Sequence, residues 1–326
     1  APHREWMPSP QEVGLLDEIQ IPEPSTLFDN GLGLGTAAKE QKMTISNHLW
    51  WEYDLKVPLE DGEEATGPDR WARGREKRMT PEELDAWHTA YQPRNQQLKE
   101  SGLRKRAEEG NPQAQKELVQ WKYQRYIKDY LRCIKGIDRN VGRLLDKIDE
   151  LELSGNTIVI YSSDQGFFLG EHGWYDKRFM YEPSLQVPLL VRWPGVTGAG
   201  VNRNELVQNL DFAPTFLDLA GLEIPEWMQG QSIVPILKGH GMPSWRKSIY
   251  YEYFGEPTHN VAAHYGVRTK RWKLIHYPEL QEWELFDLEN DPDEINSIYG
   301  KPELEDLETE LKVELNELRK QYEVVD

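Results

Sequence analysis

The order of two neighbouring segments most strongly limits what this chain can fold into. Residues 113–152 repeat apolar side chains at a period of about 3.6 residues, which predicts one long amphipathic helix that could break near Gly136. Ser154-Gly155-Asn156 ends this helix. The next run, Thr157–Tyr161, is β-branched and aromatic, as buried strands are. A long helix leading directly into a buried strand is typical of an α/β fold.

The end of the predicted strand carries two candidate metal ligands. Asp164 and Gln165 place a carboxylate and an amide oxygen where the strand gives way to a loop. In open α/β sheets, ligands bind outside the carboxyl ends of the strands. Adjacent oxygen donors suit Ca²⁺ or Mg²⁺ better than Zn²⁺, which prefers nitrogen and sulfur. The alternative is a capped turn, in which Asp164 accepts hydrogen bonds from backbone N–H groups.

A glycine-punctuated loop, a basic pair and a second strand follow. The loop spans Gly166 to Gly173, the pair is Lys177-Arg178, and the apolar run Val187–Arg192 predicts a strand. A lysine in a loop is usually a solvated charge. The residues alone therefore favour a solvated Lys177 over a Lys177 that belongs to a site.

Capping residues indicate two further helix starts. Thr80-Pro81-Glu82-Glu83 combines a capping Thr, a Pro at the first helical position and a Glu at the third, which predicts a helix from Pro81. Asp211 is placed to cap another helix, with Pro214 in its first turn. Residues 1 to about 75 are rich in Pro, Gly and Asp and are predicted to be mostly loops.

The stretch from Asn156 to Gly195 resembles the sulfatase family, within the alkaline phosphatase superfamily. The matching residues are Ser163-Asp164-Gln165-Gly166, Leu169-Gly170-Glu171-His172-Gly173, Asp176-Lys177-Arg178, Tyr181-Glu182 and Val187-Pro188-Leu189. Further matching segments are Ala1–Arg4, Asp211–Gly221, His264–Thr269, Trp283–Leu288 and Asn290–Pro292. Each short piece is weak, but the long ordered match is specific. The chain looks most similar to bacterial carbohydrate sulfatases of the N-acetylglucosamine-6-sulfatase type.

The resemblance implies a fold and a domain division. We expect an alkaline-phosphatase-like α/β core, incomplete because its amino-terminal part is absent, and a smaller C-terminal subdomain. Residues 1–244 are expected to be the carboxyl-terminal part of the catalytic domain, and residues 245–326 an antiparallel sheet packed with one helix. The strand-like runs of the subdomain are 248–253, 263–268, 273–276 and 284–287, and its leucine-striped helix is 302–322.

The resemblance also implies roles at the reacting centre. Asp164 and Gln165 would bind Ca²⁺, with Mg²⁺ the less expected ion. Lys177 would stabilise charge that develops on the sulfate ester. His3 would contact the sulfate and protonate the leaving oxygen, since the pKa of histidine lies near working pH.

Three residues are candidates for substrate binding. They are Arg178, His172 and His264. For Arg178 the alternative is an ion pair with Asp176, and for His172 it is a structural hydrogen bond in the loop.

One element of the family pattern has no counterpart in this sequence. Sulfatases make their formylglycine nucleophile from the first residue of Cys/Ser-x-Pro-Ser/Ala-Arg. Cys133, the single cysteine, has no such residues after it, and Pro243-Ser244-Trp245-Arg246 is the nearest miss. We therefore expect roughly the carboxyl-terminal two-thirds of a sulfatase, inactive by itself, with the formylglycine and further metal ligands in an absent amino-terminal part of the same enzyme.

Composition argues against some partner classes. The chain has 56 Asp and Glu against 38 Lys and Arg, a net charge of −18, which argues against binding nucleic acid or anionic membranes. No apolar stretch approaches the ~20 residues that a membrane helix needs. No signal peptide is visible, but the resemblance implies a periplasmic or secreted protein.

The leading hypothesis is a sulfuric ester hydrolase that removes sulfate from a carbohydrate, in the degradation of glycosaminoglycan or mucin. The first alternative is a phosphate or phosphonate ester hydrolase on the same scaffold. Such relatives usually carry additional His and Asp metal ligands, and no such clusters are evident here. The second alternative is a non-catalytic sugar-binding relative of sulfatases.

Overall fold

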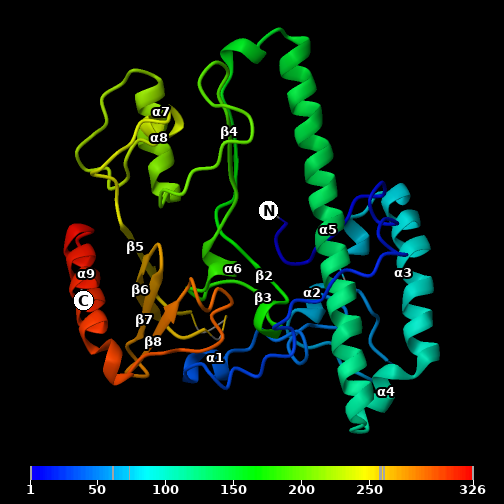
Figure 1. Cartoon of the computed structure of the whole chain (residues 1–326). Helices are drawn as coiled ribbons and strands as arrows, with labels where there is room; N and C mark the ends of the chain where they lie inside the picture. Colours follow the sequence, from blue (N-terminus) through cyan, green and yellow to red (C-terminus); the bar gives the residue numbers. More distant parts are fainter. Residues whose placement is uncertain (1, 61, 73, 257–258, 260, 325–326) are drawn as a thin grey trace. The chain divides into compact units, whose positions relative to one another are not determined.

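The computed structural model describes residues 2–60, 62–72, 74–256, 259 and 261–324 (Figure 1). The chain forms two compact units, each made of separate segments. The first unit consists of residues 1–29, 42–150 and 168–176. The second consists of residues 30–41, 151–167 and 177–326. The predicted division into residues 1–244 and 245–326 stays a prediction.

The first unit is mainly helical. Its longest element is α5 (Pro112–Glu150), which runs without interruption through Gly136, so the break considered there does not occur. The other helices are α2 (Asp69–Ala72), η1 (Glu76–Arg78), α3 (Pro81–Ser101) and α4 (Leu103–Glu108), and β2 (Phe168–Leu169) pairs with β3 (Tyr175–Asp176) around the short turn η3 (Glu171–Gly173). As predicted, α3 begins with a capping box: Thr80 accepts from the backbone of Glu83, whose side chain accepts from the backbone of Thr80.

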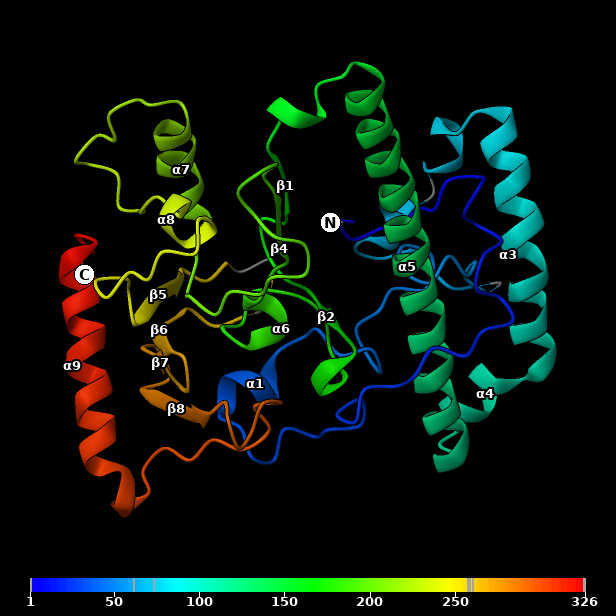
Figure 2. The same cartoon turned by 45° about the horizontal axis from the view of Figure 1, so that its top comes forward.

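A buried carboxylate joins α3 to α5. Asp129 on α5 accepts the hydroxyl of Tyr91 on α3 at 2.8 Å. The same carboxylate lies 2.8 Å from Nη1 of Arg132 and 3.3 Å from Nζ of Lys56, and the Asp129 side chain is fully buried. A buried charge is tolerated only when it is paired and hydrogen-bonded, and Asp129 meets this condition. In Figure 2 the two helices accordingly lie beside each other, joined through α4.

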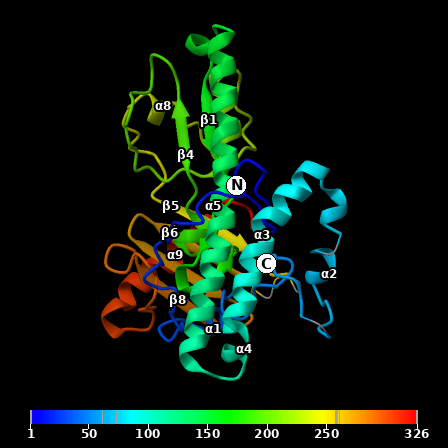
Figure 3. The same ribbon diagram turned by 90° about the vertical axis from the view of Figure 1, so that its right-hand side faces the viewer.

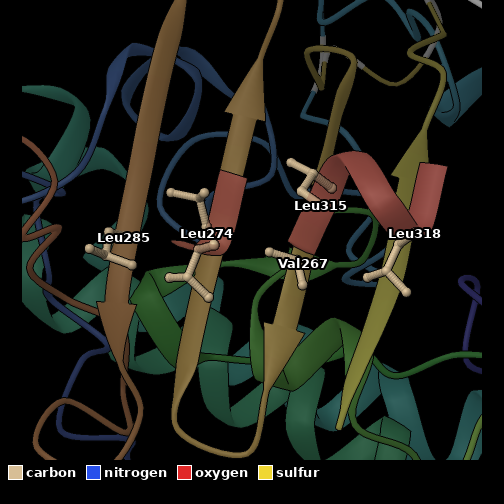
Figure 4. Packing of buried hydrophobic residues seen from close by; sticks show 6 residues of the cluster. Val267, Leu274, Leu285, Leu315 and Leu318 are labelled. Atoms are coloured by element: carbon tan, nitrogen blue, oxygen red, sulfur yellow. The ribbon is translucent and has the colours of Figure 1, made fainter. Parts of the chain in front are cut away.

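The second unit contains the predicted C-terminal sheet. The strands β5 (Ser248–Tyr253), β6 (His264–Thr269), β7 (Trp272–Tyr277) and β8 (Glu282–Asp287) form an antiparallel meander in that order. The turn η5 (Pro302–Leu304) leads into α9 (Glu305–Gln321). The leucine stripe of α9 packs on the sheet, as predicted (Figure 4). The buried residues of this core are Val267, Leu274, Leu285, Leu311, Leu315 and Leu318.

The predicted strand after the long helix is a short antiparallel pair. Strand β1 (Val159–Ser162) pairs with β4 (Leu189–Arg192), as Figure 3 shows. Both strands begin two residues later than predicted. Thr157 follows the turn η2 (Ser154–Asn156), and its hydroxyl donates to the carbonyl of Leu153 at 2.9 Å.

The remaining elements of the second unit are short. They are α1 (Thr36–Glu40), α6 (Glu182–Leu185), η4 (Asn209–Asp211), α7 (Phe212–Leu219) and α8 (Val234–Leu237). The segment that carries α1 is held at β8, since the N–H of Gly35 donates to Glu284 at 2.7 Å. Among the described residues, no helix is both long and apolar enough to cross a membrane.

The predicted capping role of Asp211 is wrong. The turn η4 continues directly into α7, so Asp211 has helical backbone angles and its side chain does not cap α7. The fully buried carboxylate instead accepts the backbone N–H groups of Gln208 and Gln231, each at 2.8 Å, and pairs with Arg246. Asp211 therefore takes part in the capping box of η4, through the N–H of Gln208, and not in a cap of α7.

Candidate active site

The two predicted metal ligands lie at the end of β1, as the sequence indicated. Asp164 and Gln165 are both exposed. Within the described part of the chain, no backbone N–H donates to the carboxylate of Asp164; its recorded partner is the hydroxyl of Ser163 at 3.4 Å. The capped-turn alternative is therefore not what the structure contains. The carboxylate is presented outward, where an ion or a ligand can reach it.

Gly166 fixes this loop by close backbone contact. Its N–H donates to the carbonyl of Ser184 at 2.9 Å. A Cβ on Gly166 would lie 2.2 Å from the carbonyl oxygen of Pro183, a distance that real Cβ atoms essentially never show. Only glycine fits here, which explains the glycine after the Asp164-Gln165 pair.

The same backbone contact brings the two predicted metal ligands close to the basic pair Lys177-Arg178. Ser184, which binds Gly166 through its carbonyl, accepts the N–H of Arg178 through its hydroxyl at 2.9 Å. The ammonium of Lys177 lies 5.9 Å from the centre of the Phe167 ring, within reach of a cation–π contact. Asp164, Gln165, Lys177 and Arg178 therefore belong to one neighbourhood of the second unit.

Lys177 is not a solvated surface lysine. The residue is only 8% exposed. The backbone on either side is strained: Asp176 has φ 73° and Arg178 has φ 101°, in the left-handed region that side chains other than glycine rarely adopt. Each such residue costs about 1–3 kcal/mol and persists only where the surroundings hold it. The solvated alternative is therefore not what the structure contains, and the catalytic role of Lys177 stays a prediction.

His264 is a buried packing residue. It is 1% exposed, and its ring stacks on Phe179 at a centroid distance of 5.6 Å. Its Nε2 accepts the N–H of Met180 at 3.1 Å, and its Nδ1 lies 2.8 Å from the carbonyl of Ala262. Burial lowers the pKa of His264 to about 4, so the ring is neutral at pH 7. Both nitrogens serve the protein itself, and the predicted sugar contact of His264 stays a prediction.

His172 occupies the turn between β2 and β3 in the first unit. Its backbone is left-handed, with φ 56°, and its N–H donates to the hydroxyl of Thr26 at 3.0 Å. Its Nδ1 lies 3.3 Å from Asp29, and its ring meets those of Phe168 and Trp174. These contacts match the structural alternative considered for this residue.

His3 is exposed, and the residue after it is firmly held. Arg4 makes two hydrogen bonds to the carboxylate of Asp54, at 2.8 and 2.6 Å, and one to the hydroxyl of Tyr175 at 3.1 Å. The Asp54 side chain is fully buried, so this bidentate pair fixes the chain next to His3. His3 thus projects from an anchored segment of the first unit.

Within the described ranges, no group of three or more His, Cys, Asp or Glu side chains is arranged to hold a metal ion. Asp164 and Gln165 supply two oxygens, whereas Ca²⁺ takes six to eight. The predicted binding of calcium by Asp164 and Gln165 therefore stays a prediction.

Sequence reasoning missed the buried charges behind the Lys177 loop. The carboxylate of Glu182 lies 2.9 Å from Nζ of Lys273 and 3.0 Å from Arg268, and Lys273 also lies 2.6 Å from Glu294. The sequence did point to Glu182, because Tyr181-Glu182 is one of the segments that match the sulfatase pattern. Nothing in the sequence pointed to Lys273 or Glu294, since a lysine in a strand and a glutamate in an acidic turn are usually surface charges.

Comparison with known proteins supports the resemblance read from the sequence. Residues 42–222 match the family model described as sulfatase. Residues 170–321 match the model described as N-sulphoglucosamine sulphohydrolase, C-terminal. Together the two matches span most of the chain.

Three relatives show the extent of the likeness. An N-acetylglucosamine-6-O-sulfatase of Bacteroides thetaiotaomicron is 43% identical over 99% of this chain and 56% of its own length. Human arylsulfatase K is 36% identical over 54% of this chain and 34% of its own length. A structure solved in complex with its substrate D-glucosamine-2-N,6-O-disulfate has a TM-score of 0.90 and 41% identity, covering 100% of this chain and 65% of that one.

The chain spans about half the length of the first of these curated relatives and about a third of the second. The structural likeness confirms the expected fold, an alkaline-phosphatase-like α/β core with a C-terminal four-stranded sheet and helix. The sulfatase model alone covers more than half of the residues. The chain belongs to the sulfatase family.

Proposed function

We propose that the protein hydrolyses a sulfate ester on a sulfated carbohydrate, with a 6-O-sulfated glucosamine as the substrate. The observation that carries the proposal is the 43% identity, over 99% of the chain, to an enzyme named N-acetylglucosamine-6-O-sulfatase. The structure solved with D-glucosamine-2-N,6-O-disulfate supports the same sugar class. Degradation of a sulfated glycosaminoglycan, outside the cytoplasm, belongs to this proposal.

Lys177 would act on the sulfate group. Its ammonium is largely removed from water and lies beside Phe167, so its field is screened less than that of a surface lysine. Sulfate transfer builds negative charge on the sulfuryl and leaving oxygens, and a fixed cation stabilises this charge without having to reorganise. Arg178, the next residue, would contribute a second positive charge for binding the anionic substrate.

Asp164 and Gln165 fit a hard cation. Both donors are oxygens, both side chains are exposed, and Gly166 holds their loop in place. They would hold Ca²⁺ together with further oxygen ligands from an amino-terminal part of the same enzyme. When bound, the ion would polarise the sulfate ester as a Lewis acid.

His3 would serve the leaving group. Its ring is exposed on a segment anchored by Arg4, so it can approach a substrate and give a proton to the departing sugar oxygen. The nucleophile would be a formylglycine in the amino-terminal part.

Release of sulfate from N-acetylglucosamine 6-sulfate by the full-length protein tests the proposal. We expect saturable release, measured by ion chromatography, and little phosphate from N-acetylglucosamine 6-phosphate. Faster phosphate release would favour the phosphate ester alternative. Binding of the sulfated sugar without any turnover would favour the non-catalytic alternative.

A further inference from the structure

The backbone that follows Lys177 is bound by side chains of the C-terminal sheet. Tyr251 on β5 donates its hydroxyl to the carbonyl of Arg178 at 2.6 Å. His264 on β6 accepts the N–H of Met180 at 3.1 Å. The two anchors lie on neighbouring strands, and they bind backbone groups one and three residues beyond Lys177.

Tyr181 and Glu182, further along the loop, are bound by carboxylates on or just after β8. The hydroxyl of Tyr181 donates to Glu284 on β8 at 2.8 Å. The N–H of Glu182 donates to Glu294, beyond β8, at 2.6 Å. Glu284 accepts a second hydroxyl, from Tyr277 on β7, at 2.9 Å. Each strand of the sheet thus contributes to holding residues 178–182.

The charges around Glu182 complete the attachment. Lys273 pairs with the carboxylates of both Glu182 and Glu294, and Arg268 donates to both oxygens of Glu182, at 3.2 and 3.0 Å. Burial opposes ionisation, but Lys273 and Arg268 still lower the pKa of Glu182 to about 2. Glu182 is therefore ionised at neutral pH and ties the loop to both β6 and β7.

We propose that the four-stranded sheet sets the position of Lys177, with His264 and Tyr251 as positioning residues that act through the loop backbone. The left-handed backbone at Asp176 and Arg178 requires surroundings that hold it, and the contacts of Arg178 and Met180 with the sheet supply them on one side. The proposal rests on the proposed function, in which Lys177 contacts the sulfate. It also gives His264 a role in the reaction without any contact to the sugar.

Neighbouring tyrosines on β5 offer a matched pair of variants. Tyr251 binds the loop, whereas Tyr250 packs on the opposite, α9-covered face of the sheet and donates its hydroxyl to Glu252 at 2.7 Å. Tyr251→Phe and Tyr250→Phe each remove one hydroxyl from the same strand. For His264, Phe keeps a ring but no acceptor, and Gln keeps an acceptor near the position of Nε2.

Amide hydrogen exchange in the chain of residues 1–326 reads the attachment directly. We expect the amides of residues 178–182 to exchange at least tenfold faster in Tyr251→Phe and His264→Phe, and at the wild-type rate in Tyr250→Phe. His264→Gln should recover part of the protection of these amides from exchange. This comparison keeps the test valid if His264→Phe is poorly folded. Equal exchange in Tyr251→Phe and Tyr250→Phe would overturn the proposal.

Kinetics of the full-length enzyme on N-acetylglucosamine 6-sulfate separate this inference from the proposed function. We expect kcat to fall at least tenfold in Tyr251→Phe, with a smaller change in KM, and to stay within twofold in Tyr250→Phe. If Tyr251→Phe speeds amide exchange but leaves kcat unchanged, while Lys177→Ala inactivates the enzyme, the positioning role is refuted and the proposed function stands. If Lys177→Ala itself leaves kcat unchanged, the proposed role of Lys177 fails, and the positioning role fails with it although the attachment stands.

Discussion

The hydroxyl of Tyr181 lies 2.8 Å from Oε2 of Glu284, a carboxylate with no exposed surface. Burial raises the pKa of Glu284, while the N–H of Gly35 and the hydroxyls of Tyr181 and Tyr277 work against this rise by binding the charged form. Residues 35, 181, 277 and 284 therefore meet at one buried point. The loop that follows Lys177, the predicted catalytic lysine, is therefore anchored in the core of the second unit. Substitutions in this core can test the site.

Replacing Lys177 should damage the chemical step. Removing one donor that stabilises transition-state charge typically lowers kcat by about 10²–10³, and we expect this for Lys177→Ala in the full-length enzyme. Lys177→Arg should recover only part of the rate, because a planar guanidinium does not fit where a compact ammonium is buried. Lys270→Ala, at an exposed position of the same unit, is the control. Steady-state kinetics that place Lys177→Ala within about twofold of wild type would remove Lys177 from the site.

Replacing Asp164 should weaken binding of the metal. Asp164→Ala removes a charged oxygen ligand, so we expect the affinity for Ca²⁺, measured by calorimetry on the full-length protein, to fall along with the rate. Gln165→Asn keeps an amide oxygen and should be milder. Asp146→Ala changes the net charge equally at an exposed position of α5 and should have no effect. Unchanged Ca²⁺ affinity in Asp164→Ala would rule out its assignment as a ligand.

Gly166→Ala should disturb the same site through the backbone. The added Cβ would overlap the carbonyl oxygen of Pro183, so the loop must move. We expect a loss of stability of about 1–3 kcal/mol or more, with a weaker Ca²⁺ site. Gly155→Ala is the matched control, because a Cβ there meets nothing within 4 Å. Urea unfolding checks the stability, and similar values for the two variants would contradict the prediction.

Stability should fall in mild acid because of His264. Its pKa is lowered to about 4 by burial, below the ordinary value of 6.5. Between these pH values His264 is protonated in the unfolded chain but neutral in the folded protein. Its contribution to the free energy of unfolding is therefore complete above pH 6.5 and is lost as the pH falls to about 4. The shift corresponds to about 3 kcal/mol. Unfolding curves from pH 7 to pH 4 should show this loss in the wild type, and a smaller loss in His264→Phe.

Breaking the Asp211–Arg246 pair should destabilise the second unit strongly. Arg246→Met would leave a fully buried carboxylate without its cation, and such a loss costs about 3–5 kcal/mol. Glu289→Gln is the comparison, since Glu289 forms an exposed pair with Arg271 at 3.3 Å, and exposed pairs contribute about 0–1 kcal/mol. Equal midpoints in urea for the two variants would contradict the burial argument.

Much of the local structure could be predicted from the sequence. The capping box at Thr80, the 39-residue helix α5 and the strand β5 all follow from patterns within a few residues, and the structure has them within about one or two residues of the predicted bounds. Such elements are specified locally, by side-chain periodicity and by hydrogen bonds between near neighbours. The family could also be recognised from the sequence, because a long ordered series of short motifs is specific even where each motif alone is not.

Roles that depend on distant partners could not be read in this way. Asp211 resembled a helix cap, but Arg246, 35 residues later, takes its carboxylate. The bond from Met180 to Nε2 of His264, 84 residues later, was equally invisible in the sequence, while the sugar contact predicted for His264 stays a prediction. In both cases the observed partner comes from a segment that is distant in the sequence, and no local pattern contains it.

The sequence by itself determined the helices, the meander of the second unit, the family and the residues of interest, because these depend on neighbouring residues or on motif order. Only the tertiary structure decided that Lys177 is buried and that His264 binds backbone. It also decided that Asp164 offers its carboxylate outward. Burial and many of the hydrogen-bond partners are set by segments that are distant in the sequence, as in the bond between Tyr251 and Arg178, which are 73 residues apart. The free energy of a charged or polar group depends on these surroundings, which no local pattern contains.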